Sequence, residues 1–230
     1  MASAGRPAVD FQLYLITDRR LIAPRSLPDA CGDLLAALAA ESGTVGVAIQ
    51  LREKDLGGRE LYALGTALRE LCSRYGARLL VNDRIDVALA VEADGVHLPA
   101  DSFSVADARS LVGSSRLIGV STHSSAEAAQ AAAGGADFAV FGPVWPPLSK
   151  AAYGAARGAE ELGAACRAAD VMPVFALGGV TAERASTLGA LGGAGRPAGV
   201  AVIGAVFGAD DPARAALALR DALRRTLPPR

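Results

Sequence analysis

Several short apolar runs in this chain of 230 residues are followed by polar residues of the kinds that bind phosphate. Gln50, Arg52 and Lys54 alternate along the chain, so in an extended segment their side chains share one face. Two cations and an amide on one face suit a phosphate ester or a pyrophosphate. The alternative is a surface ion-pair cluster with Glu53 and Asp55. It is less favoured because the two cations follow a strand end and not a helix face.

The third apolar run ends in Asn82 and Asp83. Mg²⁺ prefers oxygen ligands and bridges phosphate groups, so Asp83 is a candidate metal ligand. The alternative is an ordinary carboxylate at the start of a helix.

His97 and His123 are the two histidines of the chain, and both lie at the ends of apolar runs. A lone histidine is usually structural. His123, which lies between hydroxyl residues, is the better candidate for proton transfer.

Glycines follow the last two apolar runs, at Gly178, Gly179 and Gly204. Glycine exposes backbone N–H groups and lets a ligand approach, so such a loop and the next helix start can cradle a phosphate. The alternative is that Gly178 and Gly179 only form a tight turn.

Eight apolar runs recur, and they are continuous rather than alternating, as expected for parallel strands buried on both faces. They lie at 13–16, 46–51, 78–81, 95–98, 117–120, 138–141, 174–177 and 199–203. Segments with helical spacing lie between them, at 29–41, 59–75, 86–91, 105–112, 125–133, 182–191 and 212–225. This order predicts an α/β fold, a single (β/α)8 TIM barrel, whose active site lies at the carboxyl ends of the strands.

No linker divides the chain, so we expect one domain over 1–230, with a core at about 13–226 and a flexible N-terminus at 1–10. The glycine-rich segment 192–198 is expected to be a flexible surface insertion.

Composition excludes several classes of function. The net charge of −1 does not favour nucleic-acid binding, and no apolar stretch is long enough to cross a membrane. The first ten residues contain no apolar run of the kind found in signal peptides, so we expect a cytoplasmic protein. The three cysteines, Cys31, Cys72 and Cys166, lack metal-binding spacing and are interpreted as apolar packing residues. The expected partners are small molecules, and the oligomeric state stays open, a homo-oligomer included.

Seven motifs resemble the thiamine-phosphate synthase and thiazole tautomerase family over about residues 13–207. They are Tyr14-Leu15-Ile16-Thr17-Asp18-Arg19, Gln50-Leu51-Arg52-Glu53-Lys54, Val81-Asn82-Asp83-Arg84, Asp94-Gly95-Val96-His97-Leu98, Gly119-Val120-Ser121-Thr122-His123, Phe141-Gly142-Pro143-Val144 and Ala176-Leu177-Gly178-Gly179-Val180. They occur in the family's order, each at an expected strand end. Synthases join a hydroxymethylpyrimidine pyrophosphate to a thiazole phosphate with Mg²⁺, whereas the tautomerases aromatise a thiazole carboxylate phosphate without metal.

The resemblance implies roles for individual residues. The pyrimidine pyrophosphate would be held by Gln50, Arg52, Lys54, Asn82, Ser121, Ser149 and Lys150. The thiazole phosphate would be held by Gly178, Gly179, Ile203 and Gly204. The metal candidates are Asp83 and Asp101. The catalytic candidates are Arg52, Lys54, Ser121, His123 and Lys150.

Two segments depart from the family's pattern. After the fourth strand, synthases usually carry a second metal carboxylate where ungapped alignment places Ser102, and Asp101 comes one residue early. The sixth loop has Pro147 and Ser149 where threonines are usual. The run 98–104 looks closer to the tautomerases, while Arg52, Lys54 and Asp83 favour a synthase. The tautomerase and a non-catalytic barrel that binds a phosphate ligand are the alternatives.

Overall fold

Eight parallel strands form a closed barrel in chain order, with β1 paired to both β2 and β8. The computed structural model describes residues 7–42, 46–146 and 155–228. The strands are β1 Leu13–Ile16, β2 Val47–Leu51, β3 Arg78–Asn82, β4 Gly95–Leu98, β5 Leu117–Thr122, β6 Phe138–Phe141, β7 Val174–Leu177 and β8 Gly199–Val202. The (β/α)8 fold predicted from the apolar runs is confirmed.

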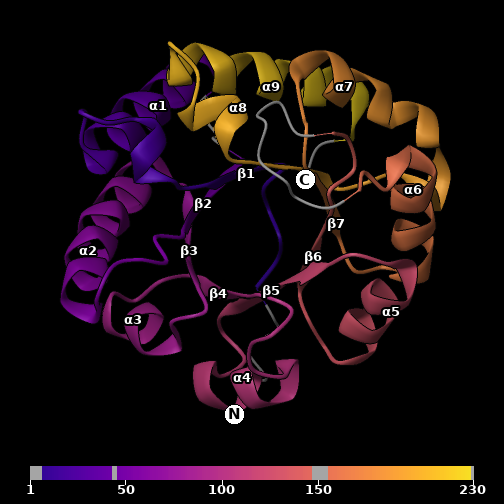
Figure 1. Ribbon diagram of the computed structural model, residues 1–230, viewed down its shortest axis with the longest axis horizontal. Coiled ribbons are helices and arrows are strands. Elements are labelled where there is room, and N and C mark those ends of the chain that lie inside the picture. Colours follow the sequence, from indigo (N-terminus) through magenta and orange to yellow (C-terminus); the bar gives the residue numbers. More distant parts are fainter. Residues whose placement is uncertain (1–6, 43–45, 147–154, 229–230) are drawn as a thin grey trace.

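Helices surround the barrel in the order of the chain (Figure 1). They are α1 Leu27–Ser42, α2 Gly58–Tyr75, α3 Ile85–Ala90, α4 Val105–Val112, α5 Ser125–Ala133, α6 Gly158–Ala168, α7 Ala182–Thr187, α8 Gly204–Phe207 and α9 Pro212–Thr226. Short 3-10 helices lie at Arg19–Leu21, Leu188–Leu191 and Gly193–Gly195. Ser104, Ser124, Thr181 and Asp211 each accept a hydrogen bond from a first-turn amide, which fixes where α4, α5, α7 and α9 begin.

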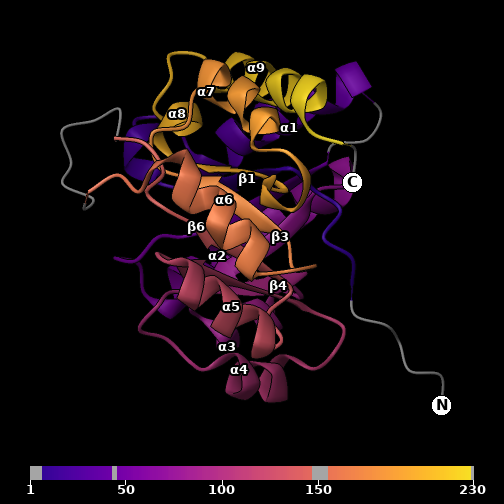
Figure 2. The ribbon, with the colours of Figure 1, turned by 90° about the vertical axis from the view of Figure 1, so that its right-hand side faces the viewer.

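Two apolar layers stabilise the fold, one between strands and helices and one inside the barrel. Side chains from all eight strands contribute to the outer layer. Figure 2 shows helices packed along the side of the barrel. The inner layer is built on aromatic rings: Phe11 lies 5.2 Å from Phe175 and 5.5 Å from Phe138, centroid to centroid. These rings fill the interior, so the barrel is a packed core and not a pore.

Three parts of the chain differ from the sequence-based expectation. The predicted helix 182–191 is divided into α7 and a 3-10 turn. The segment 192–198 is partly packed, because Gly195 and Pro197 are buried and the turn Gly193–Gly195 contacts α6. In the predicted flexible N-terminus, Asp10 forms an ion pair of 2.6 Å with Arg78.

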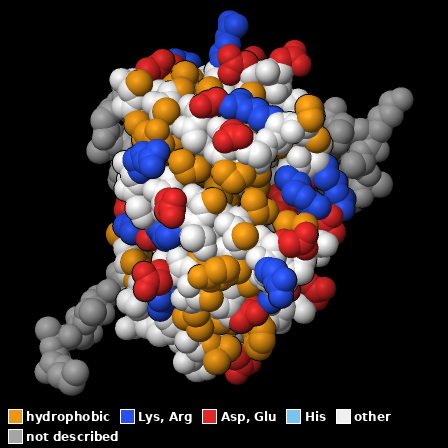
Figure 3. Space-filling model, turned by 90° about the vertical axis from the view of Figure 1, so that its left-hand side faces the viewer, with side chains coloured by type: hydrophobic (Ala, Val, Ile, Leu, Met, Phe, Trp, Pro, Cys, Tyr) orange, Lys and Arg blue, Asp and Glu red, His pale blue; other side chains and the backbone are white. Residues whose placement is uncertain are grey.

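Cations and carboxylates are intermingled on the face formed by α1, α2 and α3, with hydrophobic side chains between them (Figure 3). This face therefore carries no basic stripe of the kind that binds nucleic acid. Across the described residues, no helix combines the length and apolarity that a membrane crossing requires.

Gly119→Ala should destabilise the protein, because a Cβ at this position of β5 would lie 2.3 Å from the Phe138 ring. Overpacking of this kind costs about 1–3 kcal/mol. Gly32→Ala in α1 is the matched control: its Cβ would lie at an ordinary distance of 3.5 Å from Leu71 of α2, and alanine favours a helix over glycine by roughly 0.5–1 kcal/mol. Denaturant unfolding of both variants measures the difference. Equal stabilities would contradict the close packing inside the barrel.

Candidate functional site

The barrel mouth is the end of the barrel at which the carboxyl ends of the strands lie. Its first feature is a pair of cations, Arg52 and Lys54, that form no ion pair with a described carboxylate. Glu53 is buried, and its carboxylate lies 3.1 Å from the guanidinium of Arg19. Asp55 is paired with Arg19 at 2.7 Å and with Arg20 at 2.9 Å, and hydrogen bonds from both lower the pKa of its carboxyl group. The side chains of Arg52 and Lys54 form no ion pair with any described residue. The alternative of an ion-pair cluster involving these two cations is therefore not observed.

Gln50, Arg52 and Lys54 lead from the barrel interior to its rim. Gln50 is buried, Arg52 is half-buried and Lys54 is exposed. The backbone N–H of Arg52 donates to the Thr17 hydroxyl at 2.9 Å, which ties the end of β2 to the end of β1. The positive charge of Arg52 acts on the buried His97, whose pKa it helps to lower, whereas Lys54 is exposed at the rim.

Asp83 follows β3 in the left-handed backbone region, with φ of 63°. Non-glycine residues adopt this region at a cost, although aspartate tolerates it better than most. The backbone N–H of Asp83 donates to the His97 carbonyl at 2.9 Å, and the exposed carboxylate accepts a hydrogen bond from the Ser102 hydroxyl. The N-cap of α3 is Arg84 and not Asp83, so the helix-start alternative does not describe this carboxylate.

The loop after β4 brings Ser102, and not Asp101, into contact with Asp83. Asp101 is exposed, and no hydrogen bond or ion pair connects its side chain to Asp83 or any other described residue. Among the described residues, no group of three or more histidine, cysteine or acidic side chains could hold a metal ion. Asp83 and Asp101 both stay predicted metal ligands, and of the two only Asp83 accepts a hydrogen bond from Ser102.

His97 lies inside the barrel and belongs to a chain of polar groups. Its Nε2 lies 3.0 Å from the Ser121 hydroxyl, and its Nδ1 lies 3.4 Å from the Tyr14 hydroxyl. Gln50 Nε2 donates to the same Tyr14 oxygen at 2.9 Å. Burial, with a smaller effect from the positive charge of Arg52, lowers the pKa of His97 to about 3, so the ring is neutral near pH 7.

His123 occupies a different environment, exposed at the end of β5. Its Nδ1 lies 2.6 Å from the carbonyl oxygen of Gly142. Since a carbonyl only accepts, Nδ1 carries the proton and Nε2 of the neutral ring has a free lone pair. The backbone N–H of His123 donates to Glu127 at 2.7 Å. This fixed ring could accept a proton at Nε2.

Gly178 and Gly179 follow β7 with φ of 95° and 61°. A Cβ on Gly178 would lie 2.7 Å from Pro143, and one on Gly179 would lie 2.2 Å from the Pro146 carbonyl oxygen. Glycine is thus required at both positions by the close approach of the loop after β6. Ile203 is the N-cap of α8 and Gly204 its first residue, so backbone amides of two neighbouring loops lie at this part of the mouth.

Arg184 is a residue of the mouth that the sequence analysis did not identify. Its Nη1 donates to the carbonyl of Gly179 and, at 3.4 Å, to that of Pro146, and its guanidinium lies 5.9 Å from the centre of the Trp145 ring. Arg184 thereby connects the loops after β6 and β7. Tyr14 was also missed as a site residue, because its place in a strand indicated only packing. Ser149 and Lys150 lie outside the described residues.

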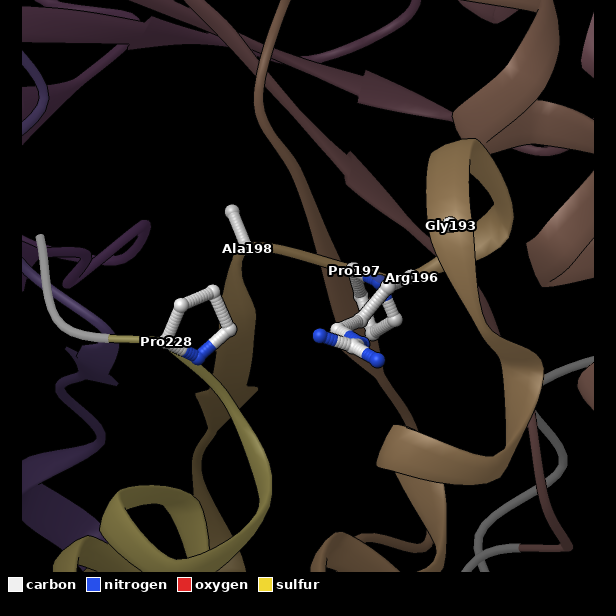
Figure 4. Close-up of a pocket in the computed structure, with 5 residues that line it drawn as sticks. All are labelled: Gly193, Arg196, Pro197, Ala198 and Pro228. Atoms are coloured by element: carbon white, nitrogen blue, oxygen red, sulfur yellow. The ribbon is translucent and has the colours of Figure 1, made fainter.

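Two surface pockets lie away from this mouth. One, lined by Gly193, Arg196, Pro197, Ala198 and Pro228, adjoins the start of β8 (Figure 4). The other lies between α5 and α6 and includes Val171 and Met172. Neither brings together residues with complementary chemistry, so the mouth is the candidate active site.

Comparisons with known proteins identify relatives of this chain. The family model for thiamine monophosphate synthase matches residues 13–206. A Geobacter sulfurreducens protein provisionally named a thiamine-phosphate synthase is 49% identical over 225 residues, covering 96% of this chain and 97% of its own. Thiamine-phosphate synthase of Desulfitobacterium hafniense strain Y51 is 38% identical over 217 residues, covering 94% and 99%.

Solved structures of known proteins are also similar to this chain. Thiamine phosphate pyrophosphorylase from Pyrococcus furiosus superposes with a TM-score of 0.80 at 34% identity, covering 95% of this chain and 98% of its own. A 3-hexulose-6-phosphate synthase, at 20% identity and a TM-score of 0.61, shares the fold. From its sequence and its fold, the chain belongs to the thiamine monophosphate synthase family.

Proposed function

We propose that this protein is a thiamine-phosphate synthase, a transferase that joins a hydroxymethylpyrimidine pyrophosphate to a thiazole phosphate and releases pyrophosphate. The observation that carries the proposal is the pair Arg52 and Lys54, unneutralised by any described carboxylate, at a mouth that also presents the Asp83 carboxylate. These groups fit a polyanionic leaving group. The family match and the named relatives support the same activity.

In this reaction the bond between the pyrimidine methylene carbon and the pyrophosphate oxygen breaks, and its electrons leave with the pyrophosphate. The ring stabilises the resulting cation, and the thiazole nitrogen donates its lone pair to form the new C–N bond. Arg52 and Lys54 bind the leaving group and stabilise its growing charge. Gln50 and Asn82 orient the pyrimidine, and Ser121 donates to the pyrophosphate. Orientation and charge stabilisation suffice, and no side-chain nucleophile is needed.

Mg²⁺ is the cofactor of the proposed reaction, and when bound it would neutralise further charge on the pyrophosphate. The residues at the mouth fit it. Asp83 offers an exposed carboxylate, Ser102 a neighbouring hydroxyl, and Mg²⁺ commonly takes one or two carboxylates together with substrate phosphates and water. Asp101 is the further metal candidate.

The thiazole phosphate is proposed to bind at Gly178, Gly179, Ile203 and Gly204, at the loops after β7 and β8. Phosphate sites of (β/α)8 barrels are commonly built from these two loops. Lys150 and Ser149 complete the pyrophosphate site in the proposal. Its partners are small molecules, and a biosynthetic reaction of this kind suits a cytoplasmic location. A homo-oligomer is compatible with the proposal.

A thiazole tautomerase is the second candidate, and the geometry of His123 favours it. The contact between Nδ1 and the Gly142 carbonyl leaves Nε2 able to move a proton on a thiazole ring. That chemistry has no use for Arg52, Lys54 and Asp83, which is why the synthase is preferred.

The direct test incubates the purified protein with both synthase substrates, with and without Mg²⁺, and follows thiamine phosphate and pyrophosphate. Condensation that requires Mg²⁺ is expected. Turnover of the thiazole carboxylate phosphate without metal, together with no condensation, would replace the synthase by the tautomerase.

Asp83→Asn should reduce Mg²⁺-dependent condensation at least about 100-fold at limiting metal. Asparagine tolerates the left-handed backbone and still accepts from Ser102, so the fold is retained while the charge is lost. Asp86→Asn is the matched control, since Asp86 is an exposed carboxylate on α3 paired with Arg84, and its rate should stay within about threefold of wild type. Equal Mg²⁺ dependence of Asp83→Asn and wild type would contradict the assignment.

His123→Gln distinguishes the two enzymes. A tautomerase that uses this ring as its acid–base group would lose roughly 10²–10⁴-fold. In the proposed synthase the variant should keep its condensation rate within about tenfold, because departure of pyrophosphate requires no proton from the imidazole. Steady-state kinetics with circular dichroism as the folding control measure this. A larger loss in condensation, with substrate affinity unchanged, would show that the ring takes part in the reaction.

A further inference from the structure

We infer that His97 is a positioning residue which fixes the direction of the Ser121 hydroxyl, so that its proton points to the barrel mouth and donates to a pyrophosphate oxygen. The inference rests on the proposed function only for the identification of the anion as pyrophosphate. The direction of the hydrogen bond between His97 and Ser121 follows from four side chains of the barrel interior.

The four side chains form an unbranched chain across four strands. Gln50 of β2 donates through Nε2 to Tyr14 of β1 at 2.9 Å, and the Tyr14 hydroxyl lies 3.4 Å from Nδ1 of His97 on β4. Nε2 of His97 lies 3.0 Å from the hydroxyl of Ser121 on β5. Gln50, Tyr14 and His97 are buried, whereas Ser121 is half-buried. This series of hydrogen bonds thus runs from the buried interior of the barrel to Ser121 at the mouth.

The direction of each hydrogen bond follows from the buried tyrosine. Its oxygen already accepts from Gln50, and its O–H needs an acceptor, because an unpaired buried hydroxyl costs about 1–3 kcal/mol. Among the described residues, the acceptor within reach is His97 Nδ1, at the long end of hydrogen-bond range. Nδ1 therefore carries no proton, and the proton of the neutral ring is on Nε2.

Ser121 is then held in one orientation. Its oxygen accepts from the Nε2–H of His97, so its own proton is available to another acceptor, and no described residue accepts it. The opposite direction would use that proton on His97 and present lone pairs to the mouth, which would repel an anion. A donor fixed before the substrate arrives stabilises growing negative charge without reorganisation.

Aromatic packing keeps the His97 ring in place. The Phe138 ring lies 5.4 Å from Tyr14 and 6.0 Å from His97, centroid to centroid. Phe138 offers no hydrogen-bonding group, so it holds these two rings by packing alone.

The first test is independent of activity. Nitrogen-15 NMR of the full-length protein labelled at histidine should show His97 with a protonated Nε2 and an unprotonated Nδ1 at neutral pH. The chain has two histidines, so His123→Gln assigns the signals. A proton on Nδ1, in either a neutral or a charged ring, would overturn the inference.

The second test is a double-mutant cycle on kcat/KM for condensation. Ser121→Ala and His97→Leu should each lower it by roughly 10–100-fold, and the double variant should be within about threefold of Ser121→Ala alone, because both remove one interaction. If the losses of His97→Leu and Ser121→Ala multiply, His97 does not act through Ser121 and the inference fails.

A third test compares His97→Gln with His97→Leu, to separate the loss of a positioning hydrogen bond from damage to the packing of the barrel. The amide of His97→Gln can place an N–H near the position of Nε2, so its kcat should exceed that of His97→Leu by about tenfold. Equal kcat values for the two variants would count against the inference. Absence of any condensation in the wild-type protein would refute the proposed function, while the NMR experiment would still decide the direction of the hydrogen bonds.

Discussion

Closure of eight short parallel strands into a barrel is the constraint on which the rest of this structure depends. Each strand pairs with two neighbouring strands, but the interior has to be filled by side chains that strands of four to six residues can supply. Large rings fill it, and glycine makes room for them, as Gly119 does for Phe138. Any polar side chain that enters this interior needs a partner there, because water cannot reach it.

At the mouth of the barrel, this need of buried polar side chains for partners produces the candidate site. Tyr14 belongs to the aromatic cluster through its ring and to the polar chain through its hydroxyl. From there polarity increases toward the mouth, from buried Gln50 and His97 to half-buried Arg52 and exposed Lys54. The apolar layer thus gives the polar groups a rigid base, and burial, with the nearby charge of Arg52, keeps the His97 ring neutral. Under the proposed function, packing preorganises the groups that bind the pyrophosphate, so that they can stabilise its growing charge without rearrangement.

Much of the fold could be predicted from the sequence, because buried parallel strands appear as continuous apolar runs and their order alone defines the barrel. Residues at strand ends, such as Gln50 and Asn82, could be placed at the mouth for the same reason. Contacts between distant residues could not. Arg19 pairs with Glu53 across 34 positions and Tyr14 meets His97 across 83, and no local spacing encodes either. The packed turn Gly193–Gly195 was likewise hidden, because glycine-rich composition resembles a loop whether or not a helix covers it.

The contact between Ser102 and Asp83 shows how a departure from the family's pattern can remain compatible with the proposed chemistry. A hydroxyl at this place holds the Asp83 carboxylate in position and adds no negative charge. With a second carboxylate there, like charges would repel each other and any approaching pyrophosphate until a metal bound. With a hydroxyl, the mouth repels the substrate less, and the protein offers a metal fewer charged ligands. Most oxygen ligands of Mg²⁺ must then come from the pyrophosphate and water, so under the proposed function the binding of metal is coupled to the binding of substrate.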